Sequence, residues 1–342
     1  MDNLKRLINT AVSRRKFVVG VGVGAGATAV LGLAGCGSSS PAPTPTPTPT
    51  PATYTDTDIL NFALNLEYLE AQFYLYAATG SGLQSSDIAP GSASPYQTVG
   101  TVTLGDAAAV PGLTPEQQDI LNEIAFEEQA HVRFLRTALG SAAVPMPDID
   151  LSFFGPLAVA ATISTNATGS GSFNPFDNFD DFLVGGFIFE DVGVTAYSGA
   201  APLISAAGVA AGYLTAAAGI LAVEAYHAGY IRTSLTGRAI AAGSAAYPYL
   251  GAANLVEDLR AKLTVGASAA PSTAGSVETL LTLPTNLTTP SAIVAASPST
   301  AVGFSRTVNQ VHHIVYGSPT VGVKSGGFFP NGTNSIFATT TA

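Results

Sequence analysis

Two pairs of a glutamate and a histidine share the same spacing along the chain. Glu128 and His131 lie in the segment EQAH, and Glu224 and His227 lie in the segment EAYH. Residues three apart on an α-helix lie on the same face, so each pair presents a carboxylate and an imidazole together. Both segments fall in the middle of helix-forming stretches, as a metal site in the core of a helical bundle requires.

Two other long apolar segments carry acids near their centres. The candidates there are Glu67, Glu70, Glu190 and Asp191. Tyr74 follows Glu67 by seven residues. Tyr197 follows Glu190 by the same number. Seven residues make about two helical turns, so each tyrosine is expected to share a face with its glutamate. The chain therefore reads as two copies of one helical hairpin.

Four long segments with helical spacing of apolar residues must position these groups. We expect helices at about 57–79, 114–139, 177–206 and 209–242. Thr57 or Asp58 can cap the first helix, and Gly80 ends it. Thr114 followed by Pro115 is typical of a helix start. Four such helices bury their apolar faces most simply as a four-helix bundle.

The third of these helices contains residues that weaken a helix. Gly185 and Gly186 lie inside it, and Pro202 lies near its end. Beyond the fourth helix we expect shorter helices at about 252–263 and 305–316. The rest of the C-terminal region is rich in Ser, Thr, Pro and Gly, which predicts mostly irregular structure.

The combined pattern resembles the ferritin-like superfamily, which includes bacterioferritin and rubrerythrin. The resemblance covers roughly residues 57–242. It implies an all-α fold, a ferritin-like four-helix bundle with long loops and an irregular C-terminal extension. In such bundles one Glu from each of two helices and a Glu-x-x-His from each of the others hold two metal ions. The implied metal ligands are Glu67, Glu128, His131, Glu190, Glu224 and His227.

The resemblance also separates neighbouring candidates in the first helix. The segment LNFALNLEYLEAQFYLYA is similar to the first helix of a bacterioferritin, which favours Glu67 over Glu70 and places Tyr74 near the site. Glu70 is then expected to face solvent. Tyr74 and Tyr197 are candidates for an electron or proton relay, with plain core packing as the alternative.

Three further residues lie outside this ligand set. Only Glu128 has the three-residue spacing to His131, so Glu127 is expected at the surface or behind the ligands. His312 and His313 fall outside the repeat, and we interpret them as structural histidines rather than a second metal site.

A metal pair explains why so many acids are expected in an apolar core. Four ionised glutamates would be very costly to bury without compensating charge. Two divalent cations balance them, and two neutral imidazoles complete the shell. Mixed oxygen and nitrogen ligation suits iron or manganese, and zinc is a plausible occupant in vitro. Open positions on such a pair bind O2 or peroxide, so we expect a small oxidant or a metal ion as substrate.

The first 53 residues predict export and anchoring. Residues 1–35 carry Arg14 and Arg15 before an apolar run and resemble a twin-arginine export signal. The segment LAGC resembles a lipobox that lipidates Cys36, the only cysteine; a buried cysteine ending a transmembrane helix is the alternative. Residues 36–53 form a Pro-Thr linker, extended as polyproline II. We therefore expect an exported protein, lipid-anchored to a bilayer in the cell envelope or periplasm.

The remaining chain divides into a bundle at 54–245 and a C-terminal helix with an irregular extension at 246–342, packed on the bundle. Removing residues 1–35 takes away one acid and five bases, so the net charge changes from −10 to −14. This acidic domain is a poor candidate for binding nucleic acid. The charged residues at the helix centres argue against an integral membrane protein, and an oligomer is compatible with the sequence.

Two functions fit these features. The first is an exported di-metal protein that reduces O2 or peroxide, or oxidises Fe2+, in stress protection. The second is a non-catalytic envelope protein, stress-protective or adhesive, in which the bundle is a scaffold. The ending GGFFPNG and the irregular segment before it resemble desiccation-related ferritin-like proteins. Long insertions and a lipid anchor disfavour a closed storage cage.

Overall fold

The computed structural model describes residues 54–163, 173–243, 247–265, 281, 294–296 and 301–341. Contacts divide the chain into Met1–Pro51 and a compact unit, Ala52–Ala342, that holds all the described residues. Arg14, Arg15 and Cys36 lie outside the described residues, as do the predicted signal and linker. In the described ranges we find no helix with the length and apolar character needed to cross a membrane.

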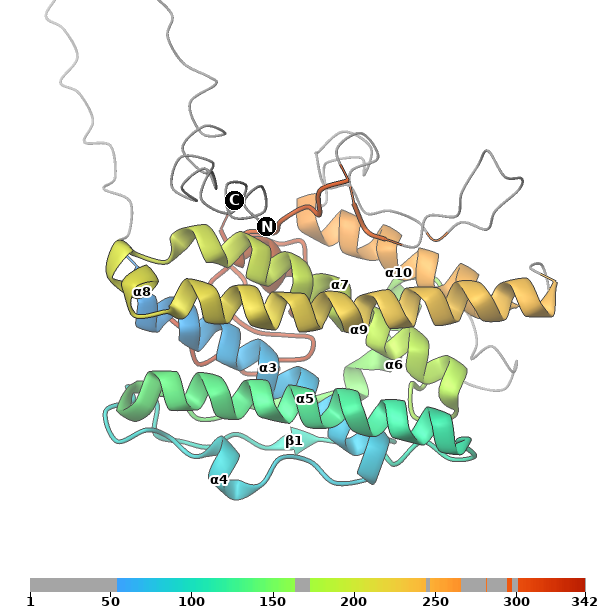
Figure 1. Ribbon diagram of the computed structural model, residues 1–342, viewed down its shortest axis with the longest axis horizontal. Coiled ribbons are helices and arrows are strands. Elements are labelled where there is room, and N and C mark those ends of the chain that lie inside the picture. The colour runs from blue at the N-terminus through green and yellow to red at the C-terminus, as the bar shows by residue number, and fades with distance from the viewer. Residues whose placement is uncertain are drawn as a thin grey trace, which may run out of the picture. The chain divides into compact units, whose positions relative to one another are not determined.

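Four long helices form a bundle. They are α3 (Asp56–Thr79), α5 (Pro115–Leu139), α7 (Phe179–Ala200) and α9 (Tyr213–Ala242). α3 packs mainly against α5, and α7 packs mainly against α9, so the bundle consists of two helix pairs (Figure 1). The all-α four-helix bundle expected from the sequence is confirmed.

Capping residues set the ends of the first helix pair. The side chain of Thr55 accepts a hydrogen bond from the Asp58 amide and caps α3, so the expectation that Thr57 or Asp58 caps this helix was wrong. Gly80, in the left-handed conformation, ends α3. Thr114 caps α5, and Pro115 occupies its first position as expected.

The two adjacent glycines of α7 do not interrupt the helix. A Cβ atom on Gly186 would lie 2.9 Å from the Tyr74 hydroxyl and 2.7 Å from Ile231 Cδ1. One on Gly185 would lie 2.5 Å from Pro175 Cβ. The glycines lower helix propensity, but their missing side chains let neighbouring groups approach the helix closely.

The chain between α7 and α9 turns in short elements. Pro202 lies in a short 3-10 helix, η3 (Ala201–Leu203), because its ring is incompatible with a continuing helix interior. A five-residue helix, α8 (Ala206–Ala210), follows, and the left-handed Gly212 precedes α9. The expected helices at 177–206 and 209–242 are therefore shorter than predicted and separated by α8.

Smaller elements lie in the connections before α7. They are α4 (Ser85–Ile88), β1 (Val102–Thr103), η1 (Gly140–Ala142), β2 (Ile149–Asp150), η2 (Leu151–Phe153) and α6 (Phe154–Ala160). β1 and β2 pair in parallel, with Val102 opposite Ile149. This pairing ties the connection that follows α3 to the one that follows α5.

The C-terminal region packs on the bundle. α10 (Pro248–Val265) is longer than the helix expected at 252–263, and α11 (Val308–Val315) is shorter than the one expected at 305–316. Both helices contact α7. The ring of Phe328 lies 4.9 Å from that of Phe189 on α7 and 5.0 Å from that of Phe154, measured between centroids. The region after α11 therefore contributes to the same hydrophobic core.

A buried network of charges attaches α10 to α7 and α9. Asp191 Oδ2 accepts hydrogen bonds from Arg232 Nη1 at 2.7 Å and from Arg260 Nη2 at 3.0 Å. Glu257 Oε1 accepts a second hydrogen bond from Arg232 Nη1 at 2.9 Å. All four side chains are at most 3% exposed. Two acids balance two arginines, so the network is neutral overall.

Candidate metal centre

Six side chains from the four long helices converge inside the bundle. α3 contributes Glu67, α5 contributes Glu128 and His131, α7 contributes Glu190, and α9 contributes Glu224 and His227. All six are buried, and the most exposed of them, His131, is only 8% exposed. The structure thus brings together all the residues that the resemblance implied as ligands.

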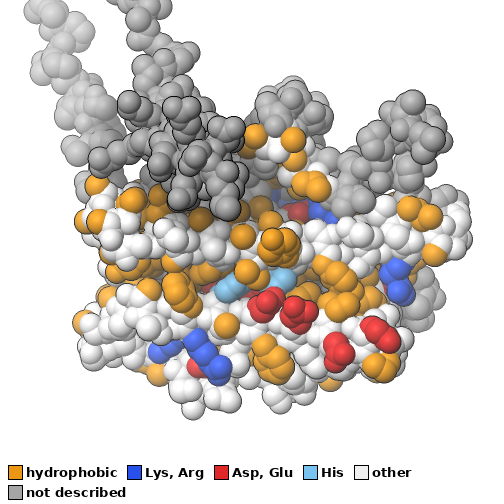
Figure 2. Space-filling model, viewed as in Figure 1, with side chains coloured by type: hydrophobic (Ala, Val, Ile, Leu, Met, Phe, Trp, Pro, Cys, Tyr) orange, Lys and Arg blue, Asp and Glu red, His pale blue; other side chains and the backbone are white. Residues whose placement is uncertain are grey.

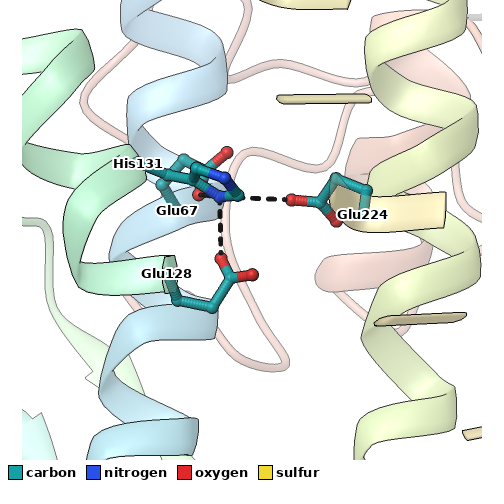
Figure 3. Close-up of side chains that lie close together, drawn as sticks. All are labelled: Glu67, Glu128, His131 and Glu224. Carbon is teal, nitrogen blue, oxygen red and sulfur yellow. Dashed lines mark ion pairs between the residues drawn. The ribbon is translucent and has the colours of Figure 1, made fainter. Parts of the chain in front are cut away.

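The first group of ligand atoms surrounds His131. Its Nδ1 atom lies 3.2 Å from Glu67 Oε2, 3.4 Å from Glu128 Oε2 and 3.7 Å from Glu224 Oε1. These atoms all lie within 4.8 Å of one another. Figure 3 shows the three carboxylates approaching the ring from three different helices. One metal ion could bind all four residues.

The second group surrounds His227. Its Nδ1 atom lies 3.0 Å from Glu128 Oε1 and 3.5 Å from Glu190 Oε2. Glu128 therefore presents one carboxylate oxygen to each histidine. A carboxylate that reaches both groups in this way could be a ligand to both ions of a metal pair.

Most ligand atoms of the centre lack hydrogen bonds, although they lie close together. Among the residues that the structure describes, nine buried atoms of these side chains have no hydrogen-bond partner: Glu67 Oε2, Nδ1 of His131 and His227, and both carboxylate oxygens of Glu128, Glu190 and Glu224. Each unpaired buried polar atom typically costs about 1–3 kcal/mol. The atoms lie close together without forming hydrogen bonds to one another. Carboxylate oxygens and imidazole nitrogens are ligands that suit divalent iron or manganese, so the residues fit the expected metal pair.

The pKa values show that the centre lacks positive charge. Burial raises the pKa of Glu224 well above its ordinary value, and neighbouring carboxylates add to this effect. Burial opposes charge on His131, but Glu67 and Glu128 still raise its pKa to about 11. Surrounding carboxylates likewise raise the pKa of His227 to about 12 against burial. Without metal, bound protons supply part of the positive charge that these carboxylates require.

The two tyrosines each lie beside the glutamate of the other helix pair. The Tyr197 hydroxyl donates a hydrogen bond to Glu67 Oε1. Burial raises the pKa of Tyr74 well above its ordinary value, and the charge of Glu190 raises it further. The seven-residue spacing predicted that each tyrosine shares a face with the glutamate of its own helix, but it did not reveal this exchange of partners between α3 and α7.

Glu70 is buried, so the expectation that it faces solvent was wrong. Only 5% of its surface is exposed, and a Cβ atom on Gly193 would lie 3.2 Å from Glu70 Oε1 and 2.1 Å from Glu224 Oε2. Burial raises its pKa well above the ordinary value, and the charge of Glu128 adds to the shift. The missing side chain of Gly193 gives both carboxylates room beside α7. Glu70 is therefore a fifth acid near the centre.

A groove between α5 and α9 reaches the centre from the surface. Its volume is about 300 Å³, and its lining residues are Ile120, Glu123, Ile124, Glu127, Val223, Tyr226, His227 and Tyr230. Figure 2 shows histidine side chains in this region with acidic side chains beside them. Glu127 Oε2 lies 2.8 Å from His227 Nε2, and its side chain is 44% exposed. Sequence reasoning missed this contact because it compared Glu127 only with His131.

The other acidic and histidine candidates do not belong to this centre. Asp191 follows Glu190 directly but points into the arginine network of α10. His312 Nε2 lies 3.1 Å from Thr333 Oγ1, and burial lowers the His312 pKa to about 3. His313 Nδ1 lies 2.6 Å from the backbone oxygen of Ser318. Both histidines thus have partners in the C-terminal region, away from the buried carboxylates.

Comparison with known proteins connects this geometry with a family. Residues 55–237 match the family described as Ferritin-like domain. The ferritin-like catalase Nec2 of Nesocodon mauritianus is 27% identical over 293 residues, which cover 82% of this chain and 84% of the relative. The desiccation-related protein PCC13-62 of Craterostigma plantagineum is 32% identical over 186 residues, 53% of each chain. No solved structure matches significantly.

Proposed function

Because this chain belongs to the ferritin-like domain family, we propose that its buried glutamates and histidines hold a pair of divalent metal ions that react with peroxide. The nine buried ligand atoms without hydrogen bonds carry this proposal. One ion would bind Glu67, Glu128, His131 and Glu224. The other would bind Glu128, Glu190 and His227. Iron and manganese suit these ligands best.

Peroxide dismutation is the reaction that we propose. Two molecules of H2O2 give two of water and one of O2, so no outside oxidant or reductant is needed. A bound redox-active metal pair supplies the electron exchange in such chemistry. The similarity to a protein named ferritin-like catalase supports this substrate. Reduction of O2 and oxidation of Fe2+ are the other reactions of this class that the ligand set permits.

The residues around the ligands would prepare the site for small reactants. Tyr197 holds Glu67 through its hydroxyl, and Glu127 holds His227 from the groove side. The groove admits molecules of the size of peroxide, while the apolar helix faces exclude bulk water from the carboxylates. Tyr74 and Tyr197 lie close enough to the ligands to pass a proton or an electron, which is a role that we propose for them.

Metal analysis of the full chain tests the metal proposal. We expect two Fe or Mn ions per chain after purification without chelators, and fewer than one in Glu128→Gln, which removes charge from both groups. Glu116→Gln removes a charge from an exposed position of the same helix and should keep both ions. Wild-type protein with fewer than one ion per chain, or an unchanged content in Glu128→Gln, would overturn the proposal.

Oxygen release from H2O2 tests the reaction separately. Metal-loaded wild type and Glu116→Gln should release O2, and Glu128→Gln should not. A stress-protective scaffold is the second candidate, because one relative is named a desiccation-related protein. Metal-loaded wild type that releases no O2, together with cells protected equally by Glu128→Gln and wild type, would favour the scaffold.

Export and lipid anchoring are further proposals, supported by the paired Arg14 and Arg15 and by the LAGC segment. They place the protein on a membrane of the cell envelope through lipid on Cys36. Mass spectrometry of the mature N-terminus tests this placement. An N-terminus that retains residues before Cys36, or a Cys36 without lipid, would contradict it.

A further inference from the structure

The two helix pairs are equivalent in their ligands but not in the residues next to them. Glu128 and His131 on α5 correspond to Glu224 and His227 on α9. The residue directly before the glutamate of the motif is Glu127 on α5 and Val223 on α9. One side of the repeat thus offers a carboxylate where the other offers an aliphatic side chain.

Glu127 contacts the histidine of the opposite helix pair. His227 directs Nδ1 at Glu128 and Glu190 and places Nε2 2.8 Å from Glu127 Oε2. A metal on Nδ1 leaves the proton on Nε2, so Nε2–H would donate to Glu127. Such a hydrogen bond fixes the ring orientation and increases the electron donation of the imidazole to its metal.

His131 has no equivalent support. Its Nδ1 faces Glu67, Glu128 and Glu224, but its Nε2 has no hydrogen-bond partner among the residues that the structure describes. Val223, the counterpart of Glu127, also lines the groove and cannot accept a hydrogen bond. The two imidazoles therefore differ in the group behind them and not in the atom that they present to the ligands.

We propose that Glu127 is a positioning residue that strengthens metal binding at the His227 position and leaves the His131 position unaided. Glu127 then adds to the difference between the two metal positions, which already have four and three candidate ligand residues. Carboxylates behind metal-ligating histidines typically change metal affinity about 10–100-fold. The partial exposure of Glu127 places the expected effect at the lower end of this range.

The inference rests on the proposed metal centre, so the test isolates each position first. His131→Gln in the full chain leaves the His227 position with its histidine, and His227→Gln leaves the His131 position. Co2+ binding to each protein is followed by calorimetry and by the visible absorption of the bound ion. If neither variant nor wild type binds Co2+, the proposed metal centre fails, and the inference fails with it.

Glu127→Val, which copies the residue of the other half, is then added to both proteins. We expect about tenfold weaker Co2+ binding and a shifted visible spectrum in the His131→Gln protein, and no change in the His227→Gln protein. Glu127→Gln keeps a hydrogen-bond acceptor and should restore part of the affinity. Glu123→Gln removes a charge from the same groove one turn away and should leave both affinities unchanged.

Two results would overturn the inference while leaving the metal centre intact. One is Co2+ binding that Glu127→Val changes in neither protein or weakens equally in both. The other is an equal loss in Glu123→Gln, which would make general groove charge the cause. The converse substitution, Val223→Glu in the His227→Gln protein, should strengthen binding at the His131 position, and circular dichroism verifies that each variant is folded.

Discussion

The metal centre and the arginine network of α10 both bury acids in the same bundle, but they satisfy them differently. In the network, Asp191 and Glu257 accept hydrogen bonds from Arg232 and Arg260, so the charges balance within the chain. In the centre, the carboxylates outnumber the two histidines, and nine atoms have no hydrogen-bond partner in the described part of the chain. The network balances its acids with its own arginines, and the centre has no such balance.

This difference distinguishes structural from functional burial of charge. Placing a carboxylate in an apolar core is costly unless a partner neutralises it. The network has its partners on α9 and α10, and its natural role is to hold these helices on α7. In the centre, the free-energy cost of burying carboxylates is not offset by arginines. This arrangement fits the binding of metal cations from solution. Removing an acid of the network should therefore destabilise the metal-free protein, whereas removing the charge of an acid in the centre should stabilise it.

Asp191→Asn should give the largest effect, because it breaks the neutral network. Asp191 Oδ2 lies 2.7 Å from Arg232 Nη1 and 3.0 Å from Arg260 Nη2. Removing one partner of a buried ion pair typically costs about 3–5 kcal/mol of unfolding free energy. Denaturant titration at pH 7 measures the loss, which should be the same with and without metal. A loss below about 1 kcal/mol, typical of an exposed pair, would contradict this view of the network.

Asp191 also shows what the sequence can and cannot predict. Glu190 and Asp191 are adjacent, and a helix turns by about 100° per residue, so only one of them can point to a given neighbour. The repeat pattern favoured Glu190, and the structure places Glu190 beside His227 and Asp191 beside Arg232. The partners of Asp191 lie 41 and 69 residues later in the chain, and no local periodicity predicts such contacts. Arg232 on α9 and Arg260 on α10 lie beside Asp191 only in the folded structure.

Glu224→Gln should increase the unfolding free energy of the metal-free protein, whereas Asp191→Asn should decrease it. Burial raises the pKa of Glu224 well above the value of the unfolded chain, so the folded state keeps a proton that the unfolded state loses. Stability contributed by this group is therefore present below pH 4.5 and decreases as the pH rises toward the folded pKa. Glutamine has no such proton to lose, and the variant should be more stable than wild type at pH 8.

The expected gain in unfolding free energy at pH 8 is about 1–3 kcal/mol, which is the range for an unsatisfied buried polar group. At pH 4 we expect almost no gain. Unfolding titrations of metal-free protein at both pH values measure it. Adding Mn2+ should reverse the order, because wild type gains binding energy that the variant loses. A variant that is less stable than wild type at pH 8 without metal would place Glu224 among the structural acids.

The fold was predictable to the extent that it depends on local patterns. Periodicity identified the four long helices, and the repeated motifs together with the resemblance to ferritin-like proteins indicated the six side chains that converge in the bundle. The burial of Glu70 was not predictable, because it depends on the absent side chain of Gly193 on another helix. The contact of Glu127 with His227 was missed for the same reason, since it crosses from α5 to α9. Local spacing indicated that each Glu-x-x-His pair shares one helix face, and the contacts between helices required the structure.

Arg133→Ala should give the smallest loss of stability, because it breaks an arginine–carboxylate pair whose arginine is exposed. Arg133 Nε and Nη2 lie 3.0 and 2.9 Å from the two carboxylate oxygens of Asp87, yet 48% of the Arg133 side chain is exposed. Asp87 itself is only 8% exposed in this pair, but the space that the half-exposed Arg133 side chain leaves lets water reach its carboxylate, so we expect a loss of about 1 kcal/mol at pH 7 by denaturant titration, the upper end for exposed pairs. Raising the salt concentration should reduce this loss further, while the loss in Asp191→Asn persists. If Arg133→Ala were as costly as Asp191→Asn, burial would not be what separates the two ion pairs.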